Sequence, residues 1–134
     1  MVSNFQYPIT FLPCKNLEEN RHFYEIILGL PVALEQGPCI IYKIGTENHF
    51  SYWGFCSHYD EYIQNQKKVC LTLVVETIKE VDDWHTELIK KGVKCIKEPA
   101  HTPQFKLYNG FYEDPMEYTI EIQAFYEDGK PKGV

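Results

Sequence analysis

The sequence predicts an α+β protein in which a βαβββ module occurs twice in tandem. An internal repeat carries this prediction, because residues 9–30 and 70–93 contain the same succession of features. Each copy has an apolar run, a helix-start signal, a glycine that ends the helix and a further strand-like run. With 134 residues the chain is expected to form a single domain. Its expected parts are module one at about 8–55, a linker at 56–68, module two at 69–126 and a tail at 127–134.

The elements of module one follow from local signals. Asn16 is an expected N-cap, with Glu19 three residues later as in a capping box, and Gly29 ends the helix because glycine adopts a left-handed conformation without strain. Apolar residues recur at helical spacing between these two signals. The expected elements are strands at 8–14, 31–36, 38–44 and 49–55 and a helix at 17–28.

Module two repeats the pattern, with Thr77 and Glu80 at the helix start and Gly92 at its end. The expected elements are strands at 69–76, 93–97, 105–113 and 117–125 and a helix at 78–90, with a loop through Pro99 and Pro103. In the last strand, apolar residues alternate with Thr119, Glu121 and Gln123. One face of this strand therefore packs on the helix, and the polar face either lines a cleft or meets water.

Composition restricts the partners. A net charge of −6 argues against a nucleic acid or an anionic membrane as partner. Five cysteines at irregular spacing argue against a disulfide framework and against a structural zinc site. The N-terminal residues lack the pattern of a signal peptide, and no apolar stretch is long enough to span a membrane. We expect a protein of the reducing cytoplasm.

Three segments resemble the glyoxalase/bleomycin-resistance/dioxygenase family, the vicinal oxygen chelate superfamily. Residues 16–30 (NLEENRHFYEIILGL) resemble its D-L-x-x-S-x-x-F-Y-x-x-x-L-G-L signature. Residues 87–93 (ELIKKGV) resemble L-x-x-x-G-V, and residues 111–122 (FYEDPMEYTIEI) resemble F-x-D-P-x-G-x-x-I-E-I. The resemblance covers roughly residues 8–126 and implies two βαβββ modules whose curled mixed sheets enclose a cleft.

The resemblance also implies where enzymes of this family hold a divalent metal, namely on the first and last strands of each module. The corresponding positions are Ile9, near Tyr52, Cys70 and Glu121. Isoleucine cannot coordinate a metal, and a tyrosine must first lose its proton. One thiolate and one carboxylate do not complete a zinc or iron(II) site. We therefore expect no metal and no other cofactor, although a slip of one residue in this register would bring His49 or Ser51 nearer the pocket.

Glu121 is the candidate catalytic residue, since a carboxylate at this position could act as a base. It could equally be a remnant paired with Lys106 or with a tyrosine hydroxyl. His58 lies in the linker and is expected to be structural or inert. His101 lies in a region that borders the mouth of the pocket in relatives, so it is expected near the ligand. The expected ligand-binding residues are mostly aromatic or small: Phe11, Phe50, Tyr52, Cys70, Thr72, His101, Tyr108 and Phe111.

Three function classes remain open. The first is a metal-free protein that binds a small molecule, such as a drug or toxic metabolite, like the bleomycin-binding branch of the family. The second is an enzyme of the superfamily, a lyase, isomerase, thiol transferase or dioxygenase with an atypical site based on Glu121. The third is a regulatory or structural module whose pocket is filled by its own side chains. The resemblance also implies a homodimer, for which Tyr59, Tyr62 and Trp53 are candidate exposed aromatic residues. Trp53 could equally belong to the helix-facing core.

Overall fold

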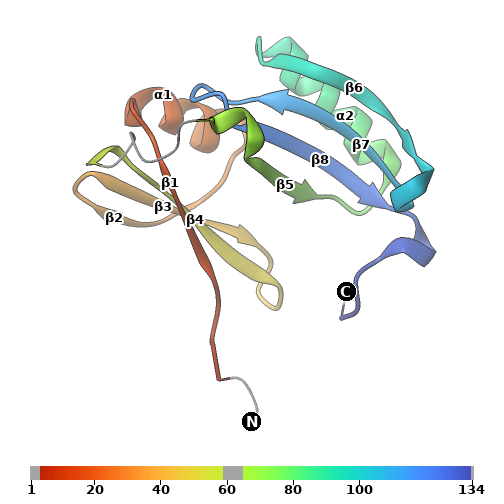
Figure 1. The fold of residues 1–134 in the computed structure, drawn as a ribbon, viewed down its shortest axis with the longest axis horizontal. Helices are drawn as coiled ribbons and strands as arrows, with labels where there is room; N and C mark the ends of the chain where they lie inside the picture. Colours follow the sequence, from red (N-terminus) through yellow and green to blue (C-terminus); the bar gives the residue numbers. More distant parts are fainter. Residues whose placement is uncertain (1–3, 59–64, 134) are drawn as a thin grey trace. The chain divides into compact units, whose positions relative to one another are not determined.

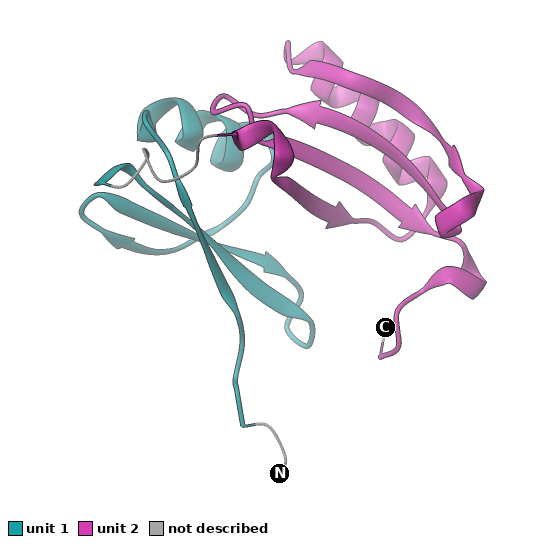
Figure 2. Ribbon diagram, viewed as in Figure 1, with its two compact units in different colours: residues 1–64 teal, residues 65–134 magenta. Residues whose placement is uncertain are grey.

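The computed structural model describes residues 4–58 and 65–133, and the chain divides into two compact units, residues 1–64 and 65–134 (Figure 2). Each unit contains, in its described part, a four-stranded mixed sheet and one main helical segment. The predicted α+β class and the tandem modules are therefore confirmed. The boundary falls within the predicted linker, and Tyr59 and Tyr62 lie outside the described residues.

Unit 1 follows the βαβββ order. Its elements are β1 (Ile9–Pro13), α1 (Leu17–Arg21), the π-helical turn η1 (His22–Ile27), β2 (Val32–Gln36), β3 (Cys39–Gly45) and β4 (Phe50–Cys56). The strand order is β1-β4-β3-β2, with β1 parallel to β4 and the other pairs antiparallel. The first and last strands of the module are thus neighbours.

The helix of unit 1 begins as predicted and then widens. The side chain of Asn16 accepts a hydrogen bond from the Glu19 N–H at 3.1 Å, which confirms the N-cap. After Arg21 the helix becomes π-helical, with the Leu28 N–H bonded to the Phe23 carbonyl five residues earlier at 2.9 Å. Gly29 then adopts a φ of +71°, as expected for a helix end. Apolar spacing predicts the buried side of this segment but does not distinguish an α turn from a π turn.

Aromatic rings fill the helix-covered side of the unit 1 sheet. The Tyr24 ring stacks on Phe55 with centroids 4.4 Å apart and meets the edge of Trp53 at 6.3 Å. The hydroxyl of buried Tyr42 donates to a Glu25 carboxylate oxygen at 2.8 Å. Trp53 is only 7% exposed, so of its two expected placements, surface or helix-facing core, the structure shows the core.

Unit 2 repeats the topology. Its elements are β5 (Cys70–Val74), α2 (Ile78–Lys90), β6 (Lys94–Thr102), β7 (Leu107–Glu113) and β8 (Thr119–Phe125), with 3-10 turns at Gln66–Lys68, Pro103–Phe105 and Glu127–Gly129. The strand order is β5-β8-β7-β6, with β5 parallel to β8. Strand β6 is longer than the predicted 93–97 and runs through Pro99. An edge strand with bulges tolerates a proline, and β6 is both at the edge and irregular in register.

Helix α2 lies along one face of the unit 2 sheet (Figure 1). Its N-cap is confirmed, since Thr77 accepts from the Glu80 N–H at 3.1 Å and donates to the Glu80 carboxylate at 3.0 Å. The core beneath the helix is mainly aliphatic, and its fully buried side chains include Val81, Leu88, Ile120 and Ile122.

The turn between β7 and β8 is built by Asp114. Its side-chain oxygen accepts the backbone N–H groups of Met116 and Tyr118 at 2.9 and 2.8 Å. Glu117 in this turn has a φ of +69°, in the left-handed region that favours glycine. The family motif quoted above has a glycine at this position, so here a glutamate occupies a strained conformation.

The expectation against disulfides is wrong for one pair of cysteines. Cys39 and Cys56 form a disulfide, with Cα atoms 4.2 Å apart. The two residues are 17 positions apart and become direct cross-strand partners through the antiparallel register of β3 and β4. Cysteine spacing alone does not contain that register.

No helix within the described residues is long and apolar enough to cross a membrane.

Candidate functional site

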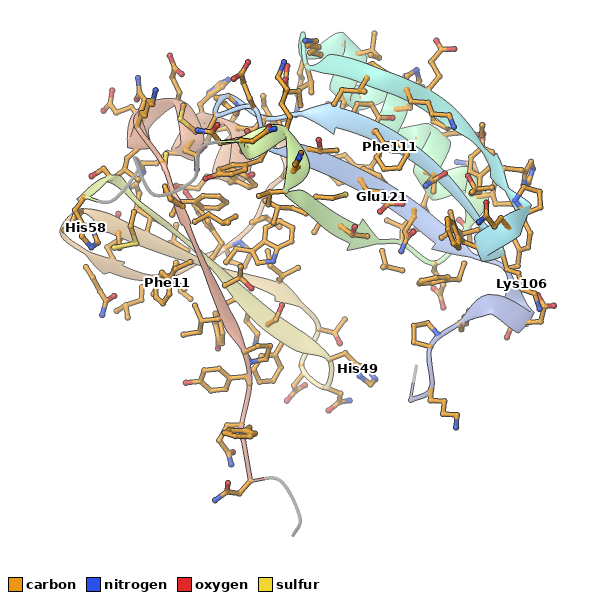
Figure 3. All side chains as sticks on the ribbon, viewed as in Figure 1. Phe11, His49, His58, Lys106, Phe111 and Glu121 are labelled. Carbon is orange, nitrogen blue, oxygen red and sulfur yellow. A yellow bond between two sulfur atoms is a disulfide. The ribbon has the colours of Figure 1, made fainter. Side chains whose placement is uncertain are left out.

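The helix-free face of the unit 2 sheet carries the predicted catalytic residue. Tyr112 and Ile120 are register partners on the face covered by α2, where the Tyr112 hydroxyl is 2.8 Å from Nδ1 of His85. Because side chains alternate along a strand, their neighbours Phe111 and Glu121 lie on the opposite face. These two are also direct partners on β7 and β8, and Figure 3 shows them on that face.

The Glu121 carboxylate is held by a hydrogen-bond network that crosses all four strands. The Thr72 hydroxyl on β5 donates to Oε1 at 2.7 Å, and the Asn109 amide on β7 donates to Oε2 at 2.7 Å. The side-chain amide oxygen of Asn109, Oδ1, in turn accepts from the Thr102 hydroxyl on β6 at 2.9 Å. Both hydrogen bonds to Glu121 come from neutral groups, so they orient the carboxylate without neutralising its charge. Glu121 itself is partly exposed.

Cys70 lies beside this network. Its sulfur is 3.8 Å from Glu121 Oε1 and 3.8 Å from the Thr72 hydroxyl. The residue as a whole is exposed, but partial burial of its thiol raises the pKa of Cys70. The negative charge of Glu121 raises that pKa further, while the hydrogen bond with Thr72 opposes the shift. Cys70 is therefore a neutral thiol at pH 7 and a weak nucleophile.

The structure places two predicted ligand-binding residues on the other face of this sheet. The Tyr108 hydroxyl donates to Asp82 of α2 at 2.7 Å. His101 is the register partner of Tyr108, and its Nδ1 lies 2.8 Å from the Tyr126 hydroxyl. Neither residue joins the Glu121 network. Lys106 is also not a partner of Glu121, because its ammonium group pairs with Asp128 at 3.1 Å.

Asn109 is a member of the Glu121 network that was not among the residues predicted from the sequence. It is only 5% exposed and links Glu121 to the far edge of the sheet. Alternation along the predicted strand indicates that Asn109 and Phe111 share a face, but it does not indicate which strand lies beside them. A buried asparagine requires hydrogen-bond partners, and a carboxylate on the neighbouring strand is a suitable one.

The helix-free face of unit 1 carries the remaining predicted residues and has a different character. Tyr7 lies 5.0 Å from the Tyr52 ring and 5.9 Å from the Phe50 ring. A shallow pocket of about 220 Å³ opens among mainly apolar residues: Tyr7, Ile9, Ala33, Leu34, Ile41 and Tyr52. The Phe11 ring lies directly over Gly54, where a Cβ atom would come within 2.5 Å of it. Phe11 is 45% exposed, so this face presents apolar surface.

The residues at the four metal-binding positions of family enzymes do not fit a catalytic metal. Ile9 and Tyr52 are register partners in unit 1, and the isoleucine has no donor atom. Cys70 and Glu121 approach each other in unit 2, and together they offer one thiol and one carboxylate. One carboxylate and one thiol fall short of the three protein ligands of a catalytic zinc site and of the two histidines and carboxylate of an iron(II) site.

Comparison with solved structures finds the same fold at low sequence identity. A glyoxalase/bleomycin resistance protein/dioxygenase from Nocardioides has a TM-score of 0.75 at 17% identity, over 100% of this chain and 92% of that chain. A lactoylglutathione lyase from Agrobacterium tumefaciens has a TM-score of 0.71 at 16% identity, over 91% of this chain and 94% of that chain. A glyoxalase/bleomycin resistance protein/dioxygenase family enzyme from Burkholderia phytofirmans PsJN has a TM-score of 0.72 at 19% identity, over 87% and 95%.

The sequence carries the family signal over most of its length. Residues 6–122 match the profile described as the Glyoxalase/Bleomycin resistance protein/Dioxygenase superfamily, which spans both units. No curated protein matches the chain. The matched segment contains Glu121, Cys70 and Thr72. With the repeated βαβββ topology and the profile in agreement, the chain belongs to the Glyoxalase/Bleomycin resistance protein/Dioxygenase superfamily.

Proposed function

We propose that the chain is a small-molecule binding protein that works without a resident metal ion and recognises a cationic, hydrogen-bond-donating group through Glu121. One observation carries the proposal. Neutral donors from Thr72 and Asn109 hold the Glu121 carboxylate in place, each at 2.7 Å, and leave its negative charge available. A carboxylate oriented before binding loses little conformational entropy when a ligand donates to it.

The surroundings of the carboxylate support a ligand of this class. The half-buried ring of Phe111 is the direct cross-strand partner of Glu121. An aromatic face beside a carboxylate suits a ligand that combines a cation with a flat apolar group, because the ring stacks on one part and attracts the other. The chain's net charge of −6 attracts cations over a longer range. Cationic glycopeptide drugs of the bleomycin type belong to this class.

Titration calorimetry with metal-free bleomycin, and with benzamidine as a small aromatic cation, tests the proposal. We expect the wild type to bind at least one of these probes. Because a hydrogen bond to a charged group contributes about 1.5–3 kcal/mol, Glu121→Gln should weaken that binding by roughly tenfold to 150-fold. Glu127→Gln is the matched control, since it removes the same charge from an exposed site of the same unit and should leave affinity unchanged.

Two results would overturn the proposal. Equal affinity of the wild type and Glu121→Gln would remove the carboxylate from recognition. The absence of any thermal shift with either probe or with a broad panel of cationic and neutral small molecules would favour a module without a ligand.

The proximity of Cys70 to Glu121 supports a second candidate, an enzyme of the superfamily with an atypical site. A fixed carboxylate 3.8 Å from a thiol could exchange a proton with a substrate that binds there. Mass-spectrometric detection of a product that forms with the wild type and not with Glu121→Gln would favour this candidate. Stoichiometric binding without product favours the binding protein.

A further inference from the structure

A separate cluster of metal-binding side chains lies in unit 1. Cys39, Cys56 and His58 each offer one ligand atom, and these three atoms all lie within 4.8 Å of one another. Nδ1 of His58 is 3.8 Å from Sγ of Cys39, and Figure 3 shows His58 beside the disulfide. In the structure the two sulfurs are bonded to each other.

The sheet itself brings the cluster together. Cys39 begins β3 and Cys56 ends β4, and the two are direct cross-strand partners. The ladder continues one residue further, because the Ser57 N–H donates to the Pro38 carbonyl at 3.0 Å. The backbone that carries His58 is thereby held next to the cysteine pair. Both cysteines are buried, at 7% and 1% exposure, whereas His58 is exposed.

We propose that, once the disulfide is reduced, Cys39, Cys56 and His58 form a binding site for a zinc-like ion. Two thiolates and one imidazole are the ligand set of a zinc site that keeps its fourth position for water. In a tetrahedral site with sulfur at about 2.3 Å and nitrogen at about 2.0 Å from the zinc, a sulfur and a nitrogen ligand lie about 3.5 Å apart and two sulfurs about 3.8 Å apart. The distance of 3.8 Å from Cys39 Sγ to His58 Nδ1 is slightly longer than the sulfur–nitrogen value, so a small movement of the imidazole completes the geometry. Breaking the disulfide lets the two sulfurs move apart by rotation about their side-chain bonds.

The chemistry balances in two steps. A dithiol reductant transfers two electrons and two protons to the disulfide, becomes a disulfide itself and leaves thiols at Cys39 and Cys56. Zinc then binds both sulfurs and the neutral imidazole, and two protons are released. Oxidation to the disulfide removes both sulfur ligands, so metal binding and the disulfide exclude each other.

Zinc titration of the full chain with a chromophoric competitor tests the proposal, before and after reduction by a dithiol, with thiols counted in both states. We expect one zinc per chain in the reduced protein and none at this cluster in the oxidised protein. Cys39→Ser should abolish binding. His58→Ala shortens an exposed side chain and should weaken binding by at least about tenfold.

Matched controls separate this site from the other thiols and histidines. Cys95→Ser and His49→Ala should leave the zinc affinity unchanged. Substitution of cadmium should add a thiolate charge-transfer absorption that disappears in Cys39→Ser. The proposal is overturned if the disulfide stays intact under native reduction, if reduced wild type binds no more zinc than Cys39→Ser, or if His58→Ala binds as tightly as wild type.

Discussion

The two units share a topology and differ in what they place on the open face of the sheet. In unit 1 the helix-free face is apolar, with Phe11 lying over Gly54 and rings around Tyr52. In unit 2 the same face carries a polar network centred on Glu121 and Asn109. The helix-covered faces differ too, since unit 1 packs aromatic rings where unit 2 packs mainly aliphatic side chains.

This difference teaches that caps, glycines and strand pairing are common to the two units, whereas the chemistry of their open faces is not. Asn16 and Thr77 cap equivalent helices, and β1–β4 and β5–β8 are equivalent parallel pairs. None of these features depends on the residues that point away from the helix. The open faces can therefore acquire different chemistry without changing the fold.

Removing one core ring should give the largest effect in this comparison. Phe55 is fully buried and stacks on Tyr24, so Phe55→Ala should lower the free energy of unfolding by about 3–5 kcal/mol. Truncation of a fully buried residue of α2 in unit 2, Leu88→Ala, should cost about 2–5 kcal/mol. Urea denaturation of both variants measures these losses. A loss below about 1 kcal/mol in either variant would contradict the packing described for that unit.

Breaking the polar network should give an intermediate effect that is confined to unit 2. Asn109→Ala leaves the Thr72–Glu121 pair intact but removes the partners of Thr102 and of Glu121 Oε2. Such a loss costs about 1–3 kcal/mol. The same measurement on Phe105→Ala, an exposed side chain in unit 2, should show a change within about 0.5 kcal/mol. If Asn109→Ala also changed the free energy of unfolding by no more than about 0.5 kcal/mol, the network would not contribute to stability.

Alkaline pH should destabilise both units through one tyrosine each. Burial raises the pKa of Tyr42, helped by its hydrogen bond to Glu25, and burial likewise raises the pKa of Tyr112. A raised pKa means that the folded state keeps a proton that the unfolded state loses. The contribution of each tyrosine to the free energy of unfolding is complete below pH ~10 and falls by about 1.4 kcal/mol per pH unit above it. Thermal melts from pH 8 to 11 should be less pH-dependent in Tyr42→Phe and in Tyr112→Phe. Unchanged slopes in both variants would rule out these tyrosines as the cause.

Substitution in the turn that leads into the last strand should give the smallest change in stability, and here the change is expected to be stabilising. Unit 1 has a glycine, Gly45, at a φ of +111°, whereas unit 2 has Glu117 at +69°. Glu117→Gly removes the strain of a side chain in the left-handed region and should stabilise the chain by up to about 1 kcal/mol. A raised melting temperature would confirm this. Glu113→Gly, at a strand position where the carboxylate pairs with Lys94 at 3.1 Å, should instead lower it.

The sequence predicts more of the fold than of the candidate site. Caps, helix-ending glycines and alternation depend on residues that are close in the sequence. The sequence therefore predicts the helix start at Thr77 and the two faces of the last strand. It does not predict the π turn after Arg21 or the passage of β6 through Pro99, because register and packing decide them. Glu121 was identified from the family motif, but its partner Asn109 required knowledge of which strands are neighbours. The pairing of Cys39 with Cys56 required the same knowledge.

The pairing of the first strand of each module with its last strand has a consequence for synthesis on the ribosome. Strand β1 obtains its partner only when β4 has been translated, and β5 obtains its partner only when β8 has. Each unit therefore remains unable to complete its sheet until nearly all of its residues have emerged. Unit 1 can finish folding while unit 2 is still being made, so nascent chains should become protected in two steps, one for each module.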